Sequence, residues 1–204
     1  MGLLSLIFFK SGGLNCGGHY SALAEEENES ARDYILLSLL TGARKSNVLA
    51  MRWDQINLEV GLWVIPKTKN GSSHTIPVVQ QALEILKSRY ANKISEWVFP
   101  GGGKSGHLED PKKAWQRILK RAQINDLRIH DLRRSLGSWQ ASTGASLAII
   151  GKTLAHRNVS TTAIYARLNI DPVRDAMNKA TQAMWDAGSP LSDTKQRVIS
   201  INKN

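Results

Sequence analysis

The sequence predicts a mainly α-helical fold with one small antiparallel β-sheet, an α+β protein. Most segments between the turn signals place apolar residues at helical spacing. One stretch instead has two β-branched runs around Asn70 and Gly71, the strongest short-range signal for a β-hairpin. The chain has 204 residues, 42% of them hydrophobic, which is enough for one substantial domain with its own core.

Two helices are expected before the hairpin. Residues 31–40 (ARDYILLSLL) are apolar on most sides, which indicates a buried helix that ends at Thr41 and Gly42. Tyr34 lies in this run and is expected in the core. The segment 45–53 (KSNVLAMRW) predicts a second, shorter helix.

The hairpin is expected within residues 61–79 (GLWVIPKTKNGSSHTIPVV). Lys67 and Lys69 flank its tip. A lysine in such a turn usually keeps the turn soluble, but on a flexible hairpin it can also reach into a site. After the hairpin, residues 79–91 have an amphipathic pattern that predicts a helix, and 96–100 (EWVFP) predict a short extended piece.

The second half of the chain is expected to be helical. Asp110 and Pro111 combine a cap with a first-turn proline, and they predict a helix over 111–123 that carries five basic residues. The stretch 130–144 (HDLRRSLGSWQASTG) is typical of one helix that ends at its last glycine. Further helices are expected to start near positions 146, 161 and 171.

The two ends of the chain lack this organisation. We expect residues 1–19 to be a leader, disordered or foreign to the domain, residues 20–187 to form the domain, and 188–204 to be a polar tail. The single cysteine, Cys16, excludes an internal disulfide framework and favours the reducing cytoplasm. No stretch approaches the length of a transmembrane helix, so no membrane partner is expected.

The chain is basic: 27 Lys and Arg against 17 Asp and Glu give a net charge of +10. This balance favours a polyanionic partner, nucleic acid before an acidic membrane surface. Half of the excess lies in residues 104–134, which contain nine Lys and Arg and four Asp and Glu. For most of these lysines a solvated helix face is the simpler interpretation.

His130 and Arg133 stand out because they open a helix, where the dipole favours acidic residues. Three positions apart, they share a helix face and can converge on one anion, the arginine as a planar fork and the histidine as donor or base. A core histidine beside a surface arginine is an alternative of equal weight. Arg134 points about 100° away from Arg133 and is expected to be structural or a peripheral contact.

A second group of polar residues lies in 154–169 (LAHRNVSTTAIYARLN). His156 is expected to end one helix, Ser160 to cap the next, and Tyr165 to lie inside that next helix. Tyr165 is close in sequence to a histidine and an arginine, yet packing in the core is the simpler interpretation. Arg44 follows directly after a glycine turn.

Two other motifs are excluded. The GKT at 151–153 is similar to the end of a nucleotide-binding loop, but Ser146 stands where that loop requires glycine, and the stretch follows a helical run. The five histidines show no HExxH or Cys/His spacing, which excludes a zinc hydrolase.

Taken in order, these segments resemble the signature of the tyrosine recombinase (phage integrase) family. LLTGARKSNVLAMRWDQIN resembles the family's first-arginine box and TKNGSSHTIPV its lysine hairpin, in which the spacing to Pro77 favours Lys69 over Lys67. HDLRRSLGSWQASTGASLAIIGKTLAHRNVSTTAIYARL resembles the second box through the nucleophile. The resemblance covers roughly residues 30–170 and implies the DNA breaking-rejoining catalytic-domain fold. The matching positions are Arg44, Lys69, His130, Arg133, His156 and Tyr165.

The resemblance implies a site-specific DNA recombinase, or integrase, whose catalytic domain cuts and rejoins DNA in integration or excision. Tyr165 would attack the phosphorus and form a 3′-phosphotyrosyl bond. Arg44 and Arg133 would stabilise the charge that develops on the phosphate, with His156 as a third donor.

The resemblance also assigns the proton transfers, with His130 as general base and Lys69 as general acid. It implies no metal and no cofactor, because fixed cations take the place of a metal. The implied partner is double-stranded DNA. The implied assembly is a homotetramer on paired DNA sites, with a monomer as the state when free, and residues 188–204 would be exchanged between protomers.

The chain departs from the family pattern at Asn47, where the family usually has Glu, which reduces a charged contact to a neutral hydrogen bond. The family's upstream DNA-binding domain is not expected, because only residues 1–30 precede the first expected helix. Peripheral contacts to the DNA backbone are expected from Lys67, Lys104, Lys112, Lys113, Arg134 and Arg157.

Two alternatives to a recombinase remain open. One is a type IB topoisomerase, which uses the same chemistry to relax DNA. The other is a non-catalytic DNA-binding module in which the same basic residues only hold phosphates.

Overall fold

The computed structural model describes residues 22–66, 73–156, 159–167 and 177–184. They form a mainly helical fold with one three-stranded antiparallel sheet, which confirms the predicted fold class. The chain divides into two compact units, Met1–Leu168 and Asn169–Asn204, and the second contains a helix over residues 177–184.

Several sequence predictions concern residues outside the described part of the chain. They are the leader 1–19, the tail 188–204 and the cap signal at Asp171, and with them both domain boundaries stay predictions. Among the described residues, no helix is both long enough and apolar enough to cross a bilayer.

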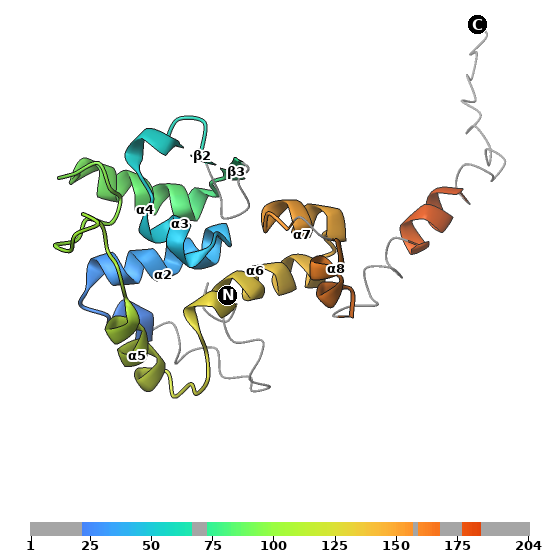
Figure 1. Ribbon diagram of the computed structural model, residues 1–204. Coiled ribbons are helices and arrows are strands. Elements are labelled where there is room, and N and C mark those ends of the chain that lie inside the picture. Colours follow the sequence, from blue (N-terminus) through green and yellow to red (C-terminus); the bar gives the residue numbers. More distant parts are fainter. Residues whose placement is uncertain (1–21, 67–72, 157–158, 168–176, 185–204) are drawn as a thin grey trace, which may run out of the picture. The chain divides into compact units, whose positions relative to one another are not determined.

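Helix α2 (Glu29–Thr41) is the central element of the first unit. It packs against α4 (Gln80–Ala91), α5 (Lys112–Arg121) and α6 (Ile129–Ser142), as Figure 1 shows. Because α2 has neighbours on several sides, its apolar residues are buried around most of its circumference, as the sequence predicts.

Local signals set both ends of α2. The side-chain oxygen of Asn28 accepts a hydrogen bond from the backbone N–H of Ala31 at 2.9 Å and caps the start. Gly42 ends the helix in the left-handed region (φ 60°), and its N–H donates to the Ser38 carbonyl. A Cβ at Gly42 would lie 2.8 Å from Leu136 of α6, so the close approach of α6 also requires glycine here.

The core fills the space between these helices and the sheet. Tyr34 is fully buried, as predicted, and its ring meets Phe99 edge to face with centroids 5.8 Å apart. Other fully buried side chains of this cluster are Ile35, Leu37, Met51, Trp63, Leu86 and Leu132.

The sheet has the order β1–β2–β3 with antiparallel pairing. Strand β2 (Leu62–Ile65) pairs with β3 (His74–Pro77), placing Ile65 opposite His74, and this confirms the predicted hairpin. The hairpin tip lies outside the described residues. Strand β1 (Ile56–Asn57) pairs with β2 and was not predicted, because two residues are too few to show alternation.

The helix predicted over 45–53 is shorter in the structure. Helix α3 (Lys45–Leu49) stops before Met51, and residues Trp53–Gln55 form the 3-10 turn η2. The backbone N–H of Trp53 donates to the Glu96 carbonyl, and the Met51 carbonyl accepts from the N–H of Val98. The backbone groups of Met51 and Trp53 therefore pair with the predicted extended piece at 96–100, and they are not available for the hydrogen bonds of a longer helix.

Helix α5 begins one residue later than predicted. Pro111 occupies the N-cap position instead of the first helical turn. The Asp110 carboxylate still accepts from the backbone N–H of Lys112, at 3.2 Å. The cap chemistry of the prediction is therefore present, with a shift of one position.

The segment after α7 (Leu147–Thr153) also corrects the prediction. Ser160 lies inside α8 (Val159–Thr162) and does not cap it, and Tyr165 lies in the 3-10 turn η3 (Ala163–Arg167). The β-branched residues of α8 are weak helix formers, and packing of Tyr165 against α6 favours the tighter turn that follows.

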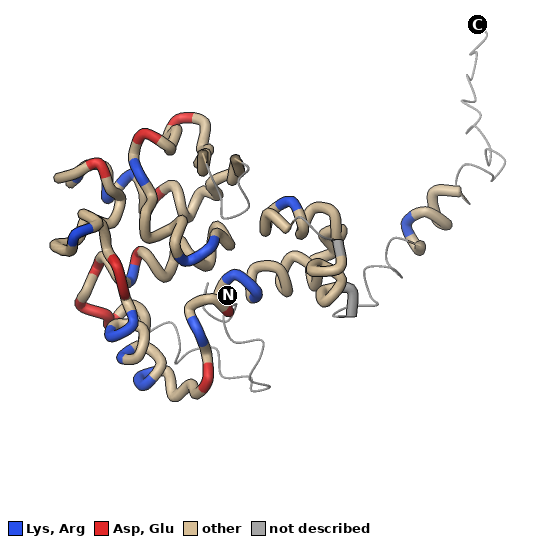
Figure 2. Tube along the Cα trace, in the orientation of Figure 1, with Lys and Arg blue, Asp and Glu red and all other residues tan. Residues whose placement is uncertain are grey.

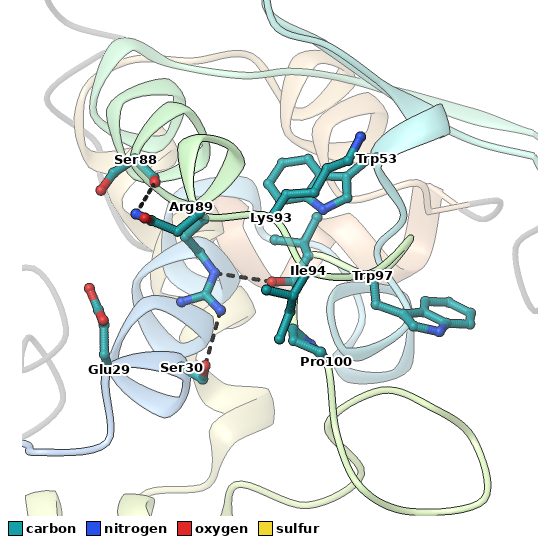
Figure 3. Close-up of a pocket in the computed structure, with 11 residues that line it drawn as sticks. Glu29, Ser30, Trp53, Ser88, Arg89, Lys93, Ile94, Trp97 and Pro100 are labelled. Carbon is teal, nitrogen blue, oxygen red and sulfur yellow. Dashed lines mark hydrogen bonds between the residues drawn. The ribbon is translucent and has the colours of Figure 1, made fainter.

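A pocket of about 220 Å³ lies between the start of α2, the end of α4 and the segment 92–100 (Figure 3). Of the charged residues that line it, Arg89 is 13% exposed and donates to Asp33, Ser30 and the Val98 carbonyl, each at 3.0 Å. These contacts join three separate elements, so Arg89 has a structural role in this pocket.

Replacing Arg89 by Ala is expected to lower the free energy of unfolding by roughly 1.5 to 3 kcal/mol, because it removes the closer partner of the buried Asp33 carboxylate and leaves only Arg32, at 3.5 Å. Urea unfolding measures the change. Arg52→Ala is the matched control: its ion pairs with Asp54 and Glu96 lie at the surface, where solvent screening leaves them little effect on stability. Equal losses in both variants would contradict the structural role of Arg89.

Candidate active site

The start of α6 places Arg133 in the interior. The backbone N–H of Arg128 donates to the Asp131 carboxylate at 3.0 Å, so an acidic first-turn residue complements the helix dipole among basic neighbours. Leu132 is fully buried and Arg133 beside it is 7% exposed. The alternative of a surface arginine is therefore wrong for Arg133.

The guanidinium of Arg133 is held by two backbone carbonyls. One Nη donates to the Gly42 carbonyl at 2.6 Å and the other to the Leu154 carbonyl. These acceptors come from the turn after α2 and from the end of α7. Burial and the neighbouring Arg44 lower the pKa of Arg133 to about 10, which still leaves it charged at neutral pH.

Arg44 also contacts the end of α7, next to the carbonyl that Arg133 binds. It occupies the N-cap position of α3, directly after the turn that Gly42 makes, and its side chain is half-buried. Its Nη2 lies 3.5 Å from the Ala155 carbonyl. In Figure 2 the basic starts of α3 and α6 lie close together, in agreement with the electrostatic repulsion between Arg44 and Arg133.

Three successive carbonyls at the end of α7 accept from three separate elements. His74 of β3 contacts the Thr153 carbonyl at 3.3 Å, Arg133 donates to Leu154, and Arg44 donates to Ala155. The C-terminal end of a helix carries a negative partial charge, so it suits this cluster of donors. The end of α7 thus orients both arginines.

Three histidines surround the arginine pair. His74 and His156 are partly buried, and His130 is exposed in the first turn of α6. Loss of solvation lowers the pKa of each histidine, and repulsion from Arg133 lowers it further, whereas the contact with the Thr153 carbonyl acts to raise the pKa of His74. His156 Nδ1 lies 3.0 Å from the Thr162 hydroxyl. The lowered pKa values keep these rings neutral at pH 7, able both to donate and to accept.

Tyr165 packs against α6 one helical turn after Arg133. It is 4% exposed and belongs to a small cluster with Ala141, Ile150 and Leu154. A Cβ on Gly137 would lie 2.8 Å from the Tyr165 hydroxyl oxygen, so the glycine makes room for the phenol. Burial raises the pKa of Tyr165, while Arg133 and Arg134 act to lower it.

The structure therefore brings together Arg44, Arg133, His156 and Tyr165, with His130 at the margin. Lys67, Lys69 and Arg157 lie outside the described residues. The remaining basic candidates, Lys104, Lys112, Lys113 and Arg134, are exposed. The Arg134 side chain is 58% exposed and lies 3.5 Å from Asp131, so it is at the surface, and whether its role is structural or a contact with DNA stays a prediction.

His74 was not among the predicted site residues. It is two positions before Ile76, which is buried, so both side chains lie on the core-facing side of β3. The sequence signal that could have found it was a polar histidine at a core-facing position of the predicted hairpin. Its contact with α7 depends on chain folding and has no signature in the sequence.

The Phage integrase family model matches residues 20–171. The integrase of Salmonella phage P22 is 30% identical over 161 residues, which cover 72% of this chain and 41% of that protein. Tyrosine recombinase XerA of Pyrococcus horikoshii is 29% identical over 160 residues, covering 74% of this chain and 56% of that protein. The chain therefore spans less than two thirds of the length of these relatives.

Solved structures show the same fold. The catalytic domain of bacteriophage HP1 integrase matches with a TM-score of 0.60 and 20% identity, over 79% of this chain and 90% of that one. The Tn1549 transposon integrase in complex with circular intermediate DNA matches with a TM-score of 0.66 and 16% identity, over 82% and 66%. With the sequence match, these findings establish that the chain belongs to the phage integrase family.

Gly137→Ala is expected to lower the free energy of unfolding by about 1 to 3 kcal/mol, because the new methyl group overlaps the Tyr165 ring. Urea unfolding measures it. Gly102→Ala is the matched control, since a Cβ there meets nothing within 4 Å. A stabilisation of Gly137→Ala, as helix propensity alone would give, would show that Tyr165 does not pack at this position.

Stability is expected to fall as the pH falls from about 7.5 to about 5.5. The unfolded chain binds protons to His74, His130 and His156 near their ordinary pKa of 6.5, whereas the folded chain binds them only at lower pH. The urea midpoint at the two pH values measures the change. A variant with all three histidines replaced by Gln should lose most of this slope, and an equally steep slope would contradict the assignment.

Proposed function

We propose that this chain is the catalytic domain of a site-specific DNA recombinase that cuts and rejoins DNA through a 3′-phosphotyrosyl bond. The observation that carries the proposal is the convergence of Arg44 and Arg133 on adjacent carbonyls, next to the turn that bears Tyr165. Membership of the phage integrase family supports it.

The two arginines suit a DNA phosphate. Each guanidinium has five N–H donors, and the backbone carbonyls of Gly42, Leu154 and Ala155 use only some of them. The remaining donors are free to bind the non-bridging oxygens of a phosphodiester. Because the carbonyls already orient the forks, little reorganisation accompanies the build-up of negative charge on the phosphorus centre.

The proposed reaction forms one bond and breaks one. The Tyr165 oxygen attacks phosphorus while His130 accepts the phenolic proton, and the bond from phosphorus to the 5′-oxygen breaks. Lys69 supplies the proton to the departing oxygen, and His156 donates to the phosphate. The reverse attack by a 5′-hydroxyl rejoins the strand, so the energy of the ester is conserved.

The low exposure of Tyr165 sets a condition on this reaction. In the structure its hydroxyl rests against Gly137, and burial raises its pKa. The phenol therefore has to turn toward the phosphate. There the positive charge of Arg133 can stabilise the ionised form of the phenol. Since α8 and η3 are short and pack in a small separate cluster, this movement leaves the main core intact.

The wider binding surface follows from the same proposal. We assign backbone contacts with double-stranded DNA to the exposed lysines of the loop before α5 and of its first turn, Lys104, Lys112 and Lys113, together with Arg134, Lys67 and Arg157. A recombinase acts on paired sites, so we propose a homotetramer on DNA and a cytoplasmic location. Cut DNA would remain attached to Tyr165 until rejoining.

Tyr165→Phe is expected to abolish covalent attachment to DNA, because it removes the attacking oxygen and little else. The assay uses a pool of nicked duplex oligonucleotides of random sequence. Cleavage near the nick releases the short fragment that carries the new 5′-hydroxyl, and its loss prevents rejoining and traps the adduct. Protein–DNA adducts are separated under denaturing conditions, and the attached DNA is sequenced.

Tyr34→Phe is the control for loss of a buried phenolic hydroxyl, and it should leave adduct formation unchanged. DNA binding without any adduct in the unaltered protein would favour a non-catalytic binding module. Attachment with no sequence preference would favour a type IB topoisomerase, and equal labelling of the Tyr165→Phe variant would exclude this nucleophile.

A further inference from the structure

We propose that His74 is a positioning residue for the strand cleavage proposed above, acting through the end of α7 on Arg133 and Arg44. The inference rests on that proposed function. His74 is not one of the residues that the sequence signature marks, and it belongs to the sheet, whereas the arginines belong to α6 and the start of α3.

The contact that carries the inference joins the sheet to the end of α7. His74 Nε2 lies 3.3 Å from the Thr153 carbonyl, 79 positions later in the chain. Because a carbonyl oxygen only accepts, Nε2 carries the hydrogen of the neutral ring. The imidazole is therefore a donor toward α7, and its fixed place in β3, opposite Ile65, defines where that donor lies.

The carbonyl that His74 holds begins the short segment on which the arginines depend. Thr153 is followed by the acceptors of Arg133 and Arg44, the Leu154 and Ala155 carbonyls. Ala155 has a φ of 46°, an uncommon conformation for a residue with a Cβ, so this turn needs contacts that hold it. His74 supplies one of them from outside the helices.

A second contact supports the same end of α7 from α6. The Gln140 side-chain nitrogen donates to the Thr153 hydroxyl at 3.1 Å, while that hydroxyl donates to the Ile149 carbonyl. The Thr153 side chain is thus held by helices, and its carbonyl by the sheet. Loss of the His74 donor should therefore leave the helix formed but its last carbonyls less closely fixed.

This arrangement predicts an effect on rate without an equal effect on folding. A small displacement of groups that orient a reacting phosphate costs about tenfold or more in rate. His74→Phe keeps a flat ring but removes the donor, whereas His74→Gln keeps a donor at similar reach. Thr75→Gln is the matched control, because Thr75 is exposed on the other face of the same strand.

The experiment measures single-turnover adduct formation at saturating concentrations of a nicked duplex recovered from the random pool. We expect His74→Phe to be slower than the unaltered protein by at least about tenfold, with unchanged DNA affinity and urea midpoint, and His74→Gln to recover most of the rate. Equal rates for the unaltered protein and His74→Phe would overturn the proposal, as would an equal loss in His74→Gln.

A second substrate separates positioning of the arginines from help to the leaving group. In a duplex with sulfur in place of the bridging 5′-oxygen, the departing thiolate needs no proton. The defect of His74→Phe should persist on this substrate, and its disappearance would overturn the proposal. Failure of the proposed function has a different signature: the unaltered protein then forms no adduct on either substrate.

Discussion

The structure depends on one buried cation, the guanidinium of Arg133. Its two hydrogen bonds tie the turn after α2 to the end of α7, and both acceptors are backbone carbonyls. Backbone acceptors carry no full charge, so they fix the position of the guanidinium without neutralising it. The site therefore combines a rigid geometry with an unbalanced positive charge, which is the state that an anionic ligand stabilises.

The repulsion between Arg44 and Arg133 is the cost of this arrangement. Two features of the fold offset it: the partial negative charge at the end of α7, and histidines beside the arginines whose lowered pKa values favour the neutral ring. These features allow the two positively charged guanidinium groups to lie close together.

Much of this could be predicted from the sequence because the signals are local. Apolar spacing gave the buried helix around Tyr34, and the Asn70 and Gly71 pair gave the hairpin. The predictions failed where a distant segment supplied the decisive partner. Residues 96–98 pair with the chain after Leu49 and shorten α3, and packing of Tyr165 on α6 gives a 3-10 turn where a helix was expected.

By itself, the sequence determined which side chains are available, their order, and the helix, strand or turn to which most of them belong. Turn chemistry and periodicity act over a few residues, so these signals are local. Tertiary structure alone decided that His74 belongs beside Thr153, that Arg133 is buried, and that the phenol of Tyr165 rests against Gly137. Those relations join positions far apart in the chain, and they arise from packing and backbone hydrogen bonds that every residue type can make.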